Sequence, residues 1–350
     1  MTDDPATGDL LVEDGDDDAL SGIATTTVHV LRAAPQAARI RLDRFIVRSV
    51  ANASRTRVQE LIAAGGVMVN GAVVLKPGRL VMPGDAVVCT IPKPPPPDII
   101  AEDIPLDIVF EDEDVIVVNK PAGMVSHPAY GNYTGTLVNA LLWHTDALSV
   151  SRGAERAGLL HRLDKDTTGL LCVAKSDIAM TRLARQFSEH TVDREYRAIV
   201  WGAFPDRRGS IDVPIGRHRS DRKKMAVVED GKEARTDYEV LEDFGPLCLV
   251  RLRLHTGRTH QIRVHMAHMR HPLLGDPTYG GRRILYGAVT GPYKHFIEQL
   301  LTLLPRQALH ARTLGFTHPV SGARVLFEAP LPRDMEQALE MLRDYFNGER

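Results

Sequence analysis

The first folded stretch of the chain has apolar residues whose spacing changes near residue 66. Over residues 41–52 they lie on one helical face, and Ser54 is a favourable N-cap for a second helix over residues 55–64. Two short apolar strands then flank Asn70-Gly71, a dipeptide typical of two-residue hairpin turns. With a last strand over residues 86–91, the pattern predicts a helix–helix–hairpin module.

A larger set of predicted elements follows a proline run at residues 94–97. Proline donates no backbone hydrogen bond and disfavours helix in the residue before it, so we predict an extended linker over residues 93–103. Beyond it, β-branched and aromatic runs predict strands, and apolar residues three or four apart predict helices. The strands cover residues 108–110, 115–120, 170–174, 195–201, 234–241 and 247–254, and the helices cover residues 136–144, 178–190, 260–269 and 335–346.

Residues 161–169, with the sequence His-Arg-Leu-Asp-Lys-Asp-Thr-Thr-Gly, follow neither the helical nor the strand period. Five charged or ionisable side chains directly precede an apolar run, which predicts a loop at the mouth of a buried sheet. Asp164 lies between Arg162 and Lys165, whose charges lower the pKa of its carboxyl and keep it ionised at neutral pH. Such a carboxylate can act as a nucleophile or as a base.

Length and composition indicate an ordinary globular protein. The chain has 350 residues, 43% of them hydrophobic, which suits about two domains. It contains no run of 18 apolar residues and its first residues are acidic, so we expect no membrane span, no secretory signal and a cytoplasmic location. The three cysteines lie far apart in apolar runs and are expected to be free thiols.

Charge is distributed unevenly along the chain. The net charge is -2, yet residues 1–31 contain eight acidic residues and no lysine or arginine. The remainder has 43 basic against 37 acidic residues, a surplus compatible with a polyanionic partner. Residues 1–36 have the small, acidic composition of a disordered tail.

Other kinds of site fit the sequence less well. Five histidines lie between residues 255 and 271, but that run has no acidic ligand and its arginines would repel a cation, so no metal is expected. There is no Gly-x-Ser-x-Gly turn, no cysteine beside a histidine and no phosphate-binding glycine loop. A basic loop over residues 217–225 carries five arginine or lysine side chains and suits contact with phosphates.

Two resemblances to known families follow from these motifs. Residues 41–91 resemble the S4 RNA-binding domain, and most of residues 40–345 resemble RNA pseudouridine synthases of the RluA/RluD type, the RluD branch in particular. Ser126 stands where that family is expected to have a larger aliphatic residue. Besides residues 161–171, the motifs are Leu42-Asp43-Arg44-Phe45, Val69-Asn70-Gly71, Asn119-Lys120-Pro121, Arg194-Glu195-Tyr196, Gly257-Arg258-Thr259-His260-Gln261-Ile262-Arg263, Gly275-Asp276 and Gln307-Ala308-Leu309-His310.

The synthase resemblance implies roles for four side chains. Asp164 matches the catalytic aspartate, which acts covalently while the uracil base is detached from C1′, rotated and rejoined through C5. Arg263 matches the arginine that pairs with this aspartate, and Tyr196 matches the aromatic residue that stacks on the base. Arg162 matches the residue that fills the space left by the flipped nucleotide. The isomerisation is redox-neutral, so no cofactor is implied.

We therefore predict an α+β protein with a tail (1–36), an S4 domain (37–92), a linker (93–103) and a catalytic domain (104–350) built on a long, mostly antiparallel mixed sheet. The expected partner is RNA, specifically a stem-loop of 23S ribosomal RNA. We expect the protein to be a monomer and to bind neither DNA nor a membrane. The alternatives are the same chemistry on tRNA or another ribosomal RNA site, or a non-catalytic ribosome-assembly factor. Phosphate contacts are assigned to Arg41, Arg44, Arg55, Arg57, Arg217, Arg219, Arg222, Lys223 and Lys224.

Overall fold

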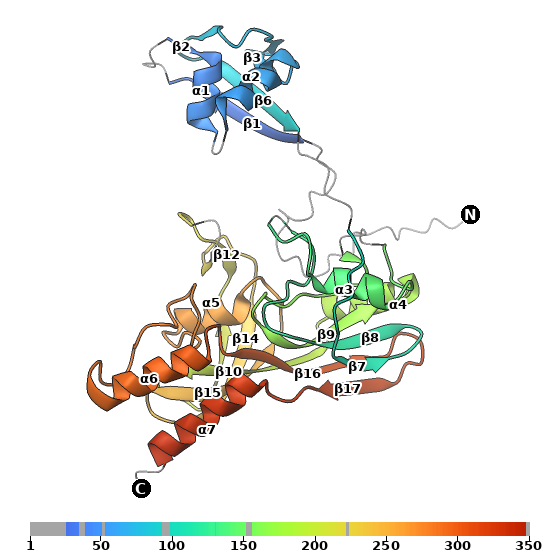
Figure 1. Ribbon diagram of the computed structural model, residues 1–350, viewed down its shortest axis with the longest axis vertical. Coiled ribbons are helices and arrows are strands. Elements are labelled where there is room, and N and C mark those ends of the chain that lie inside the picture. Colours follow the sequence, from blue (N-terminus) through green and yellow to red (C-terminus); the bar gives the residue numbers. More distant parts are fainter. Residues whose placement is uncertain are drawn as a thin grey trace. The chain divides into compact units, whose positions relative to one another are not determined.

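The computed structural model describes residues 26–34, 39–50, 53–92, 99–129, 131–151, 156–221 and 224–347. These residues form two compact units, divided between Asp98 and Ile99 (Figure 1). None of the helices in these ranges has the length and apolarity needed to cross a membrane.

The smaller unit has two helices packed on a four-stranded antiparallel sheet. The Ser54 hydroxyl caps the second helix by accepting the Arg57 N–H at 3.3 Å, as its sequence predicts. Asn70 and Gly71 have φ angles of 51° and 80°, which a tight hairpin turn requires, so the predicted hairpin is confirmed. The elements are α1 (Leu42–Ser49), α2 (Arg55–Ala63) and, in sheet order, β1 (Thr26–Arg32), β6 (Ala86–Pro92), β3 (Val67–Val69) and β4 (Ala72–Val73), with β2 (Ile40–Arg41) paired to β5 (Leu80–Val81).

Strand β1 corrects the boundary predicted for the acidic tail. Residues 26–32 were assigned to a disordered segment on composition, but they pair with β6 from Thr26 opposite Pro92 to Arg32 opposite Ala86. The acidic residues end at Asp18, and the threonine- and valine-rich stretch that follows suits a strand. Residues 1–25 and the proline run lie outside the described residues.

The larger unit contains a nine-stranded sheet in the order β11-β14-β15-β10-β16-β9-β8-β7, with β17 also paired to β16. Every pair is antiparallel except β9 with β16, which confirms the predicted mixed sheet. A separate hairpin joins β12 (Ile215–Arg217) to β13 (Met225–Val227). The sheet strands are β7 (Ile108–Glu111), β8 (Val115–Lys120), β9 (Thr168–Ala174), β10 (Asp193–Trp201), β11 (Arg208–Asp212), β14 (Arg235–Asp243), β15 (Leu247–Leu254), β16 (Leu309–Thr317) and β17 (Arg324–Glu328).

Helices cover both faces of this sheet because successive side chains of a strand point to opposite faces. On β10, Tyr196 and Ala198 pack in the core that holds α3 (Leu137–His144) and α5 (Gln261–His268). Ile199 and Trp201 pack in the core of α6 (Gly291–Leu303) and α7 (Arg333–Asn347). Helix α4 (Asp177–Ser188) packs against strands β8 and β9 on the same face of the sheet as α6 and α7. The stretch before β9 reaches the face that carries α5, since Leu163 packs in the same core as Ile262 of that helix.

Candidate active site

The loop before β9 is held by hydrogen bonds on both sides of Asp164. The Ser126 hydroxyl donates to the Leu163 carbonyl at 3.0 Å and accepts the Leu163 N–H at 3.3 Å. Arg306 Nη1 donates to the Asp166 carbonyl at 3.0 Å. Ser126, where a larger aliphatic residue was expected, thus fixes the backbone next to Asp164 by a pair of bonds that an aliphatic side chain could not make.

At Gly169, the second residue of β9, the chain passes very close to β16. Its φ angle is 112°, and a Cβ at this position would lie 2.2 Å from the Ala311 carbonyl oxygen. Gly169 and Ala311 are partners in the parallel β9–β16 register. Only glycine allows this approach, so the glycine sets where the loop joins the sheet.

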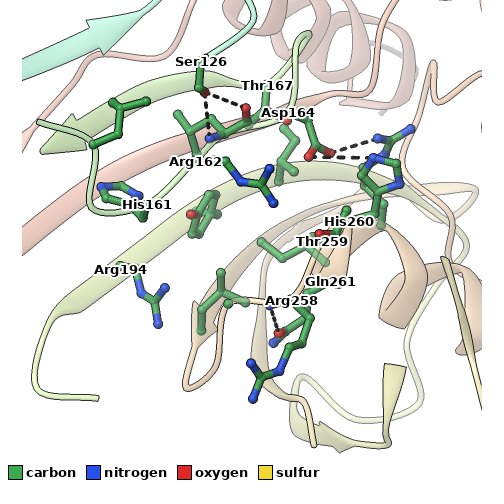
Figure 2. A pocket seen from close by; sticks show the side chains of 18 of the residues that line it. Ser126, His161, Arg162, Asp164, Thr167, Arg194, Arg258, Thr259, His260 and Gln261 are labelled. Atoms are coloured by element: carbon green, nitrogen blue, oxygen red, sulfur yellow. Dashed lines mark hydrogen bonds and ion pairs between the residues drawn. The ribbon is translucent and has the colours of Figure 1, made fainter. Parts of the chain in front are cut away.

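A cavity of about 300 Å³ opens beside Asp164 (Figure 2). Its lining includes Arg162, Tyr196 and Arg263, the other residues to which the resemblance gives roles. They come from the loop, from β10 and from α5, and the sheet brings them together. Tyr196 is buried, with 7% of its surface exposed.

Arg263 is shared by two carboxylates. Its Nη1 donates to Asp164 Oδ2 at 2.9 Å, while Nε and Nη2 donate to the two oxygens of Asp276 at 2.7 and 2.9 Å. Asp276 is fully buried and also accepts the backbone N–H groups of Thr278 and Tyr279. The Tyr279 ring lies 5.0 Å from the guanidinium. Asp276 and Tyr279 therefore fix Arg263 so that one N–H is presented to Asp164.

The Asp164 carboxyl remains ionised although it is partly buried. Burial by itself raises the pKa, but the charges of His260, Arg263 and Arg162 outweigh it, and the pKa of Asp164 lies below its usual value. His260 Nε2 lies 3.9 Å from Asp164 Oδ1. The ionisation agrees with the sequence prediction, but two of its main causes, His260 and Arg263, are distant in sequence, and the neighbouring Lys165 side chain is exposed.

Lys120 is a buried lysine that ties the loop to the end of β8. Its ammonium donates to the carbonyls of Pro121 at 2.8 Å, Met124 at 2.9 Å and Lys165 at 3.1 Å. The side chain has 0% exposure. Burial lowers the pKa of Lys120 to about 7, even though the charge of Asp164 opposes this shift.

The depressed pKa gives a testable dependence of stability on pH. The unfolded chain holds the Lys120 proton up to its ordinary pKa of 10.5, whereas the folded protein releases it near pH 7. Between these two pH values the unfolded state binds more protons than the folded state. The free energy of unfolding of the wild type, measured as its difference from that of Lys120→Met, should therefore increase with pH by up to about 1.4 kcal/mol per pH unit. Urea titrations from pH 6 to 10 measure it. A constant difference would contradict the lowered pKa of Lys120. Lys165→Met, which removes an exposed lysine side chain, is the control.

The chain is similar in sequence to known families and proteins. Residues 114–268 match the family model of RNA pseudouridylate synthases, and residues 40–87 match that of the S4 domain. The chain is 48% identical over 303 residues to YlyB of Bacillus subtilis, an uncharacterized RNA pseudouridine synthase, covering 87% of this chain and 94% of the relative. It is 47% identical over 306 residues to ribosomal large subunit pseudouridine synthase D of Zymomonas mobilis, covering 86% and 93%.

The chain belongs to the RNA pseudouridine synthase family. The solved structure of human RNA pseudouridylate synthase domain containing 4 is similar to 67% of this chain and 92% of the human one, with 28% identity and a TM-score of 0.51. The protein is thus an enzyme that isomerises uridine in RNA, as the sequence motifs predicted.

The arginines predicted to bind RNA in the S4 unit of this synthase fall into two groups. Arg41 Nη2 and Arg55 Nε donate to the buried Asp43 at 3.0 and 3.3 Å, so these two guanidinium groups are engaged within the unit. Arg44 and Arg57 have exposed side chains on α1 and α2. Of the four, Arg44 and Arg57 are therefore the better candidates for phosphate contacts.

The basic loop of the synthase connects β12 to β13, in a hairpin that stands away from the large sheet (Figure 1). Arg217 and Arg219 are exposed there. Lys224 lies 3.7 Å from the carboxylate of Asp221, an exposed pair of little energetic weight. Arg222 and Lys223 were also predicted to contact RNA, but they lie outside the described residues.

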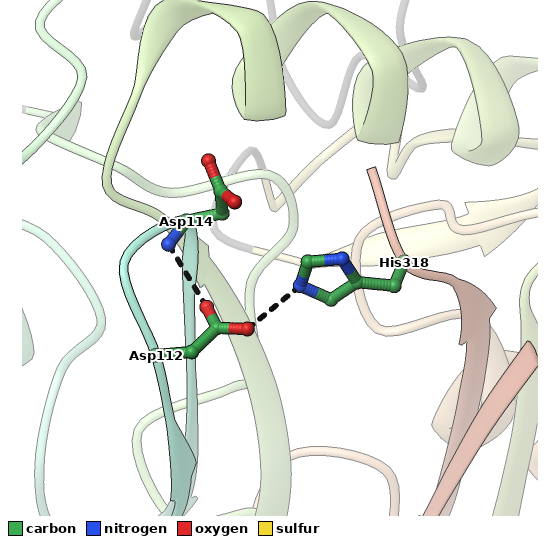
Figure 3. A group of neighbouring side chains, drawn as sticks. All are labelled: Asp112, Asp114 and His318. Atoms are coloured by element: carbon green, nitrogen blue, oxygen red, sulfur yellow. Dashed lines mark hydrogen bonds and ion pairs between the residues drawn. The ribbon is translucent and has the colours of Figure 1, made fainter. Parts of the chain in front are cut away.

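One group among the described residues has the composition of a metal site, namely Asp112, Asp114 and His318, with ligand atoms within 4.8 Å of one another (Figure 3). Asp112 Oδ1 accepts the Asp114 N–H at 2.9 Å, and Oδ2 lies 2.8 Å from His318 Nε2. His318 Nδ1 accepts the Ser321 N–H at 3.2 Å, and Lys175 Nζ donates to the Asp112 carbonyl at 2.7 Å. These contacts join the β7–β8 turn to the end of β16, and we assign the group to turn stabilisation.

Proposed function

We propose that this synthase isomerises uridine in a stem-loop of 23S ribosomal RNA, with Asp164 as the nucleophile. The observation that carries the proposal is the ionised Asp164 carboxylate, held through Oδ2 by Arg263 at the edge of a cavity. The choice of RNA is supported by relatives named ribosomal large subunit pseudouridine synthase D, such as those of Zymomonas mobilis and Pseudomonas aeruginosa. We further propose that the enzyme acts as a monomer.

The proposed reaction is a rearrangement that balances within the uridine itself. The Asp164 carboxylate attacks C1′, and the N1–C1′ bond breaks with its electron pair staying on the base. The base rotates, C5 bonds to C1′, and the carboxylate leaves. C5 then loses its proton and N1 gains one. Nothing is oxidised, reduced or hydrolysed overall, so no cofactor is needed.

Two cavity side chains would hold the extruded nucleotide. A uridine in a stem-loop must leave its stack before C1′ can be reached. Tyr196 offers a ring on which the base can stack, a contact worth ~1–3 kcal/mol. Arg162 carries a planar guanidinium that can fill the vacated position and hydrogen-bond to neighbouring bases.

Incubating the purified enzyme with 23S ribosomal RNA, 16S ribosomal RNA and bulk tRNA, and then mapping pseudouridines, tests the function. Product confined to 23S RNA is the expected result. Product only in tRNA or in 16S RNA would replace the proposed target. Binding to ribosomal RNA without any product would support the assembly-factor alternative.

Replacing Arg162 with Ala should slow the isomerisation of a structured stem-loop more than that of an unstructured oligonucleotide of the same sequence. The reason is that only the paired substrate has a vacated stack to fill. Single-turnover rates on both RNAs measure this difference. Equal losses on the two substrates would remove the proposed role of Arg162 in flipping.

The double replacement of Arg44 and Arg57 with Ala should weaken RNA binding and flatten its salt dependence. Each lost phosphate contact lowers the slope of log affinity against log salt by roughly 0.7–0.9. The same replacement of Arg41 and Arg55, which are bound to Asp43, should chiefly reduce the stability of the S4 unit. An unchanged slope in the first variant would contradict phosphate contact by Arg44 and Arg57.

A further inference from the structure

We propose that His260 is a positioning residue for Asp164, and that Tyr279 determines which nitrogen of the His260 ring faces the carboxylate. The inference rests on the proposed role of Asp164 as nucleophile. It concerns Asp164 Oδ1, the carboxylate oxygen that Arg263 does not contact, and the hydrogen bonds that orient the His260 ring beside this oxygen.

The two oxygens of Asp164 have different surroundings. Oδ2 accepts a hydrogen bond from Arg263 Nη1 at 2.9 Å. Oδ1 lies 3.9 Å from His260 Nε2, which is within ion-pair range but longer than a hydrogen bond. Asp164 and His260 both line the cavity (Figure 2). Oδ1 is therefore the oxygen available to a substrate, and His260 is the ionisable group that faces it.

The backbone of His260 is held in an uncommon conformation. Its φ and ψ angles are 55° and 20°, in the left-handed region that side chains with a Cβ rarely adopt. It occupies the N-cap position of α5, but its side chain makes no capping hydrogen bond to that helix. Such a conformation persists only where the surroundings hold it, and it often occurs at functional sites.

Tyr279 fixes the orientation of the His260 ring. The Tyr279 hydroxyl oxygen accepts the backbone N–H of Met225 at 3.0 Å and lies 2.8 Å from His260 Nδ1. Burial raises the pKa of Tyr279 to about 12, so the phenol keeps its single proton at neutral pH. Since the oxygen already accepts from Met225, we assign this proton to the hydrogen bond with His260 Nδ1.

The proton of a neutral His260 ring is therefore on Nε2, the nitrogen that faces Asp164. An N–H in this place attracts the negative Oδ1 and favours the carboxylate orientation that Arg263 also supports. The other tautomer would present a lone pair to the oxygen and repel it. Met225 is the first residue of β13, in the hairpin that carries the basic loop. The Tyr279 hydroxyl therefore contacts both this hairpin and His260.

Four variants test the proposal: His260→Ala, His260→Gln, Tyr279→Phe and, as a matched control on the exposed end of α5, His268→Gln. His260→Ala should lower kcat roughly 10²-fold, the effect of a misplaced reacting group, with little change in KM for RNA. His260→Gln retains an N–H donor and should recover part of this loss. Tyr279→Phe should lower kcat by up to about tenfold, as for one lost hydrogen bond. His268→Gln should match the wild type.

Two spectroscopic measurements do not depend on activity. Nitrogen NMR of the wild type at neutral pH should show His260 protonated at Nε2 and unprotonated at Nδ1, and Tyr279→Phe should show a mixture. A carbon NMR titration of the Asp164 carboxyl should give a higher pKa in His260→Ala, because the favourable electrostatic interaction of the ring with the carboxylate is lost. The other charged groups near this carboxyl, Arg162, Arg263 and Lys120, are unchanged in that variant.

A wild-type ring protonated only at Nδ1 would overturn the proposal. So would an Asp164 pKa that does not change in His260→Ala, or equal losses of activity and melting temperature in His260→Ala and His260→Gln. If the wild-type enzyme forms no pseudouridine, the proposed function fails by itself. The two NMR measurements then still decide whether His260 and Tyr279 position Asp164.

Discussion

Replacing Asp164 with Asn is expected to abolish pseudouridine formation while RNA binding stays close to that of the wild type. The amide is nearly isosteric with the carboxylate but cannot attack C1′, so the single-turnover rate should fall by at least roughly 10⁴-fold, as for the loss of a nucleophile. Affinity should persist because we assign the phosphate contacts to arginines and lysines elsewhere in the chain. Rates on labelled RNA and filter binding measure the two quantities.

Asp166 provides the matched control for this variant. It lies two residues further along the same loop, and the loop uses its backbone carbonyl, which accepts from Arg306 at 3.0 Å. Asp166→Asn should therefore keep most of the activity. Full activity in Asp164→Asn, or a complete loss in Asp166→Asn alone, would show that the nucleophile has been assigned to the wrong carboxylate.

Replacing Asp276 with Asn is expected to reduce stability and activity together. Asp276 accepts two hydrogen bonds from Arg263 in a fully buried position. Removing one partner of a buried ion pair costs about 3–5 kcal/mol in the free energy of unfolding when the other charge is left uncompensated. Arg263 keeps its contact with Asp164 at 2.9 Å, so the expected loss is at the lower end of this range. Arg263 would also lose the contact that orients its N–H toward Asp164, so kcat should fall roughly 10²-fold.

Denaturant unfolding and single-turnover kinetics of the same Asp276→Asn preparations check both effects. Glu298→Gln is a suitable control, because Glu298 forms an exposed pair with Lys294 at 3.7 Å on α6, away from the cavity. An exposed pair of this kind contributes about 0.3–0.5 kcal/mol. If Asp276→Asn unfolded like the control, the buried pair would not be what holds Arg263.

Local chemistry explains which elements could be predicted from the sequence. The Ser54 cap, the Asn70-Gly71 turn and the β-branched and aromatic run of β10 depend on residues a few positions apart, and the fold retains all three. Strand β1 was missed because its stability comes from β6, which lies about sixty residues further along the chain. Without its partner strand nearby in the sequence, this short stretch could not be distinguished from the end of the acidic segment that precedes it.

The candidate site divides in the same way. The sequence by itself determined that Asp164 is an ionised carboxylate in a loop before a buried strand, and the resemblance added Arg162, Tyr196 and Arg263. Only the tertiary structure decided what surrounds that carboxylate: Arg263 fixed by Asp276, and His260 turned toward it beside Tyr279. Asp164 lies 99 residues before Arg263 in the sequence, so only the fold brings the two side chains together. Burial and distant charges, rather than sequence neighbours alone, therefore set the pKa and the orientation of Asp164.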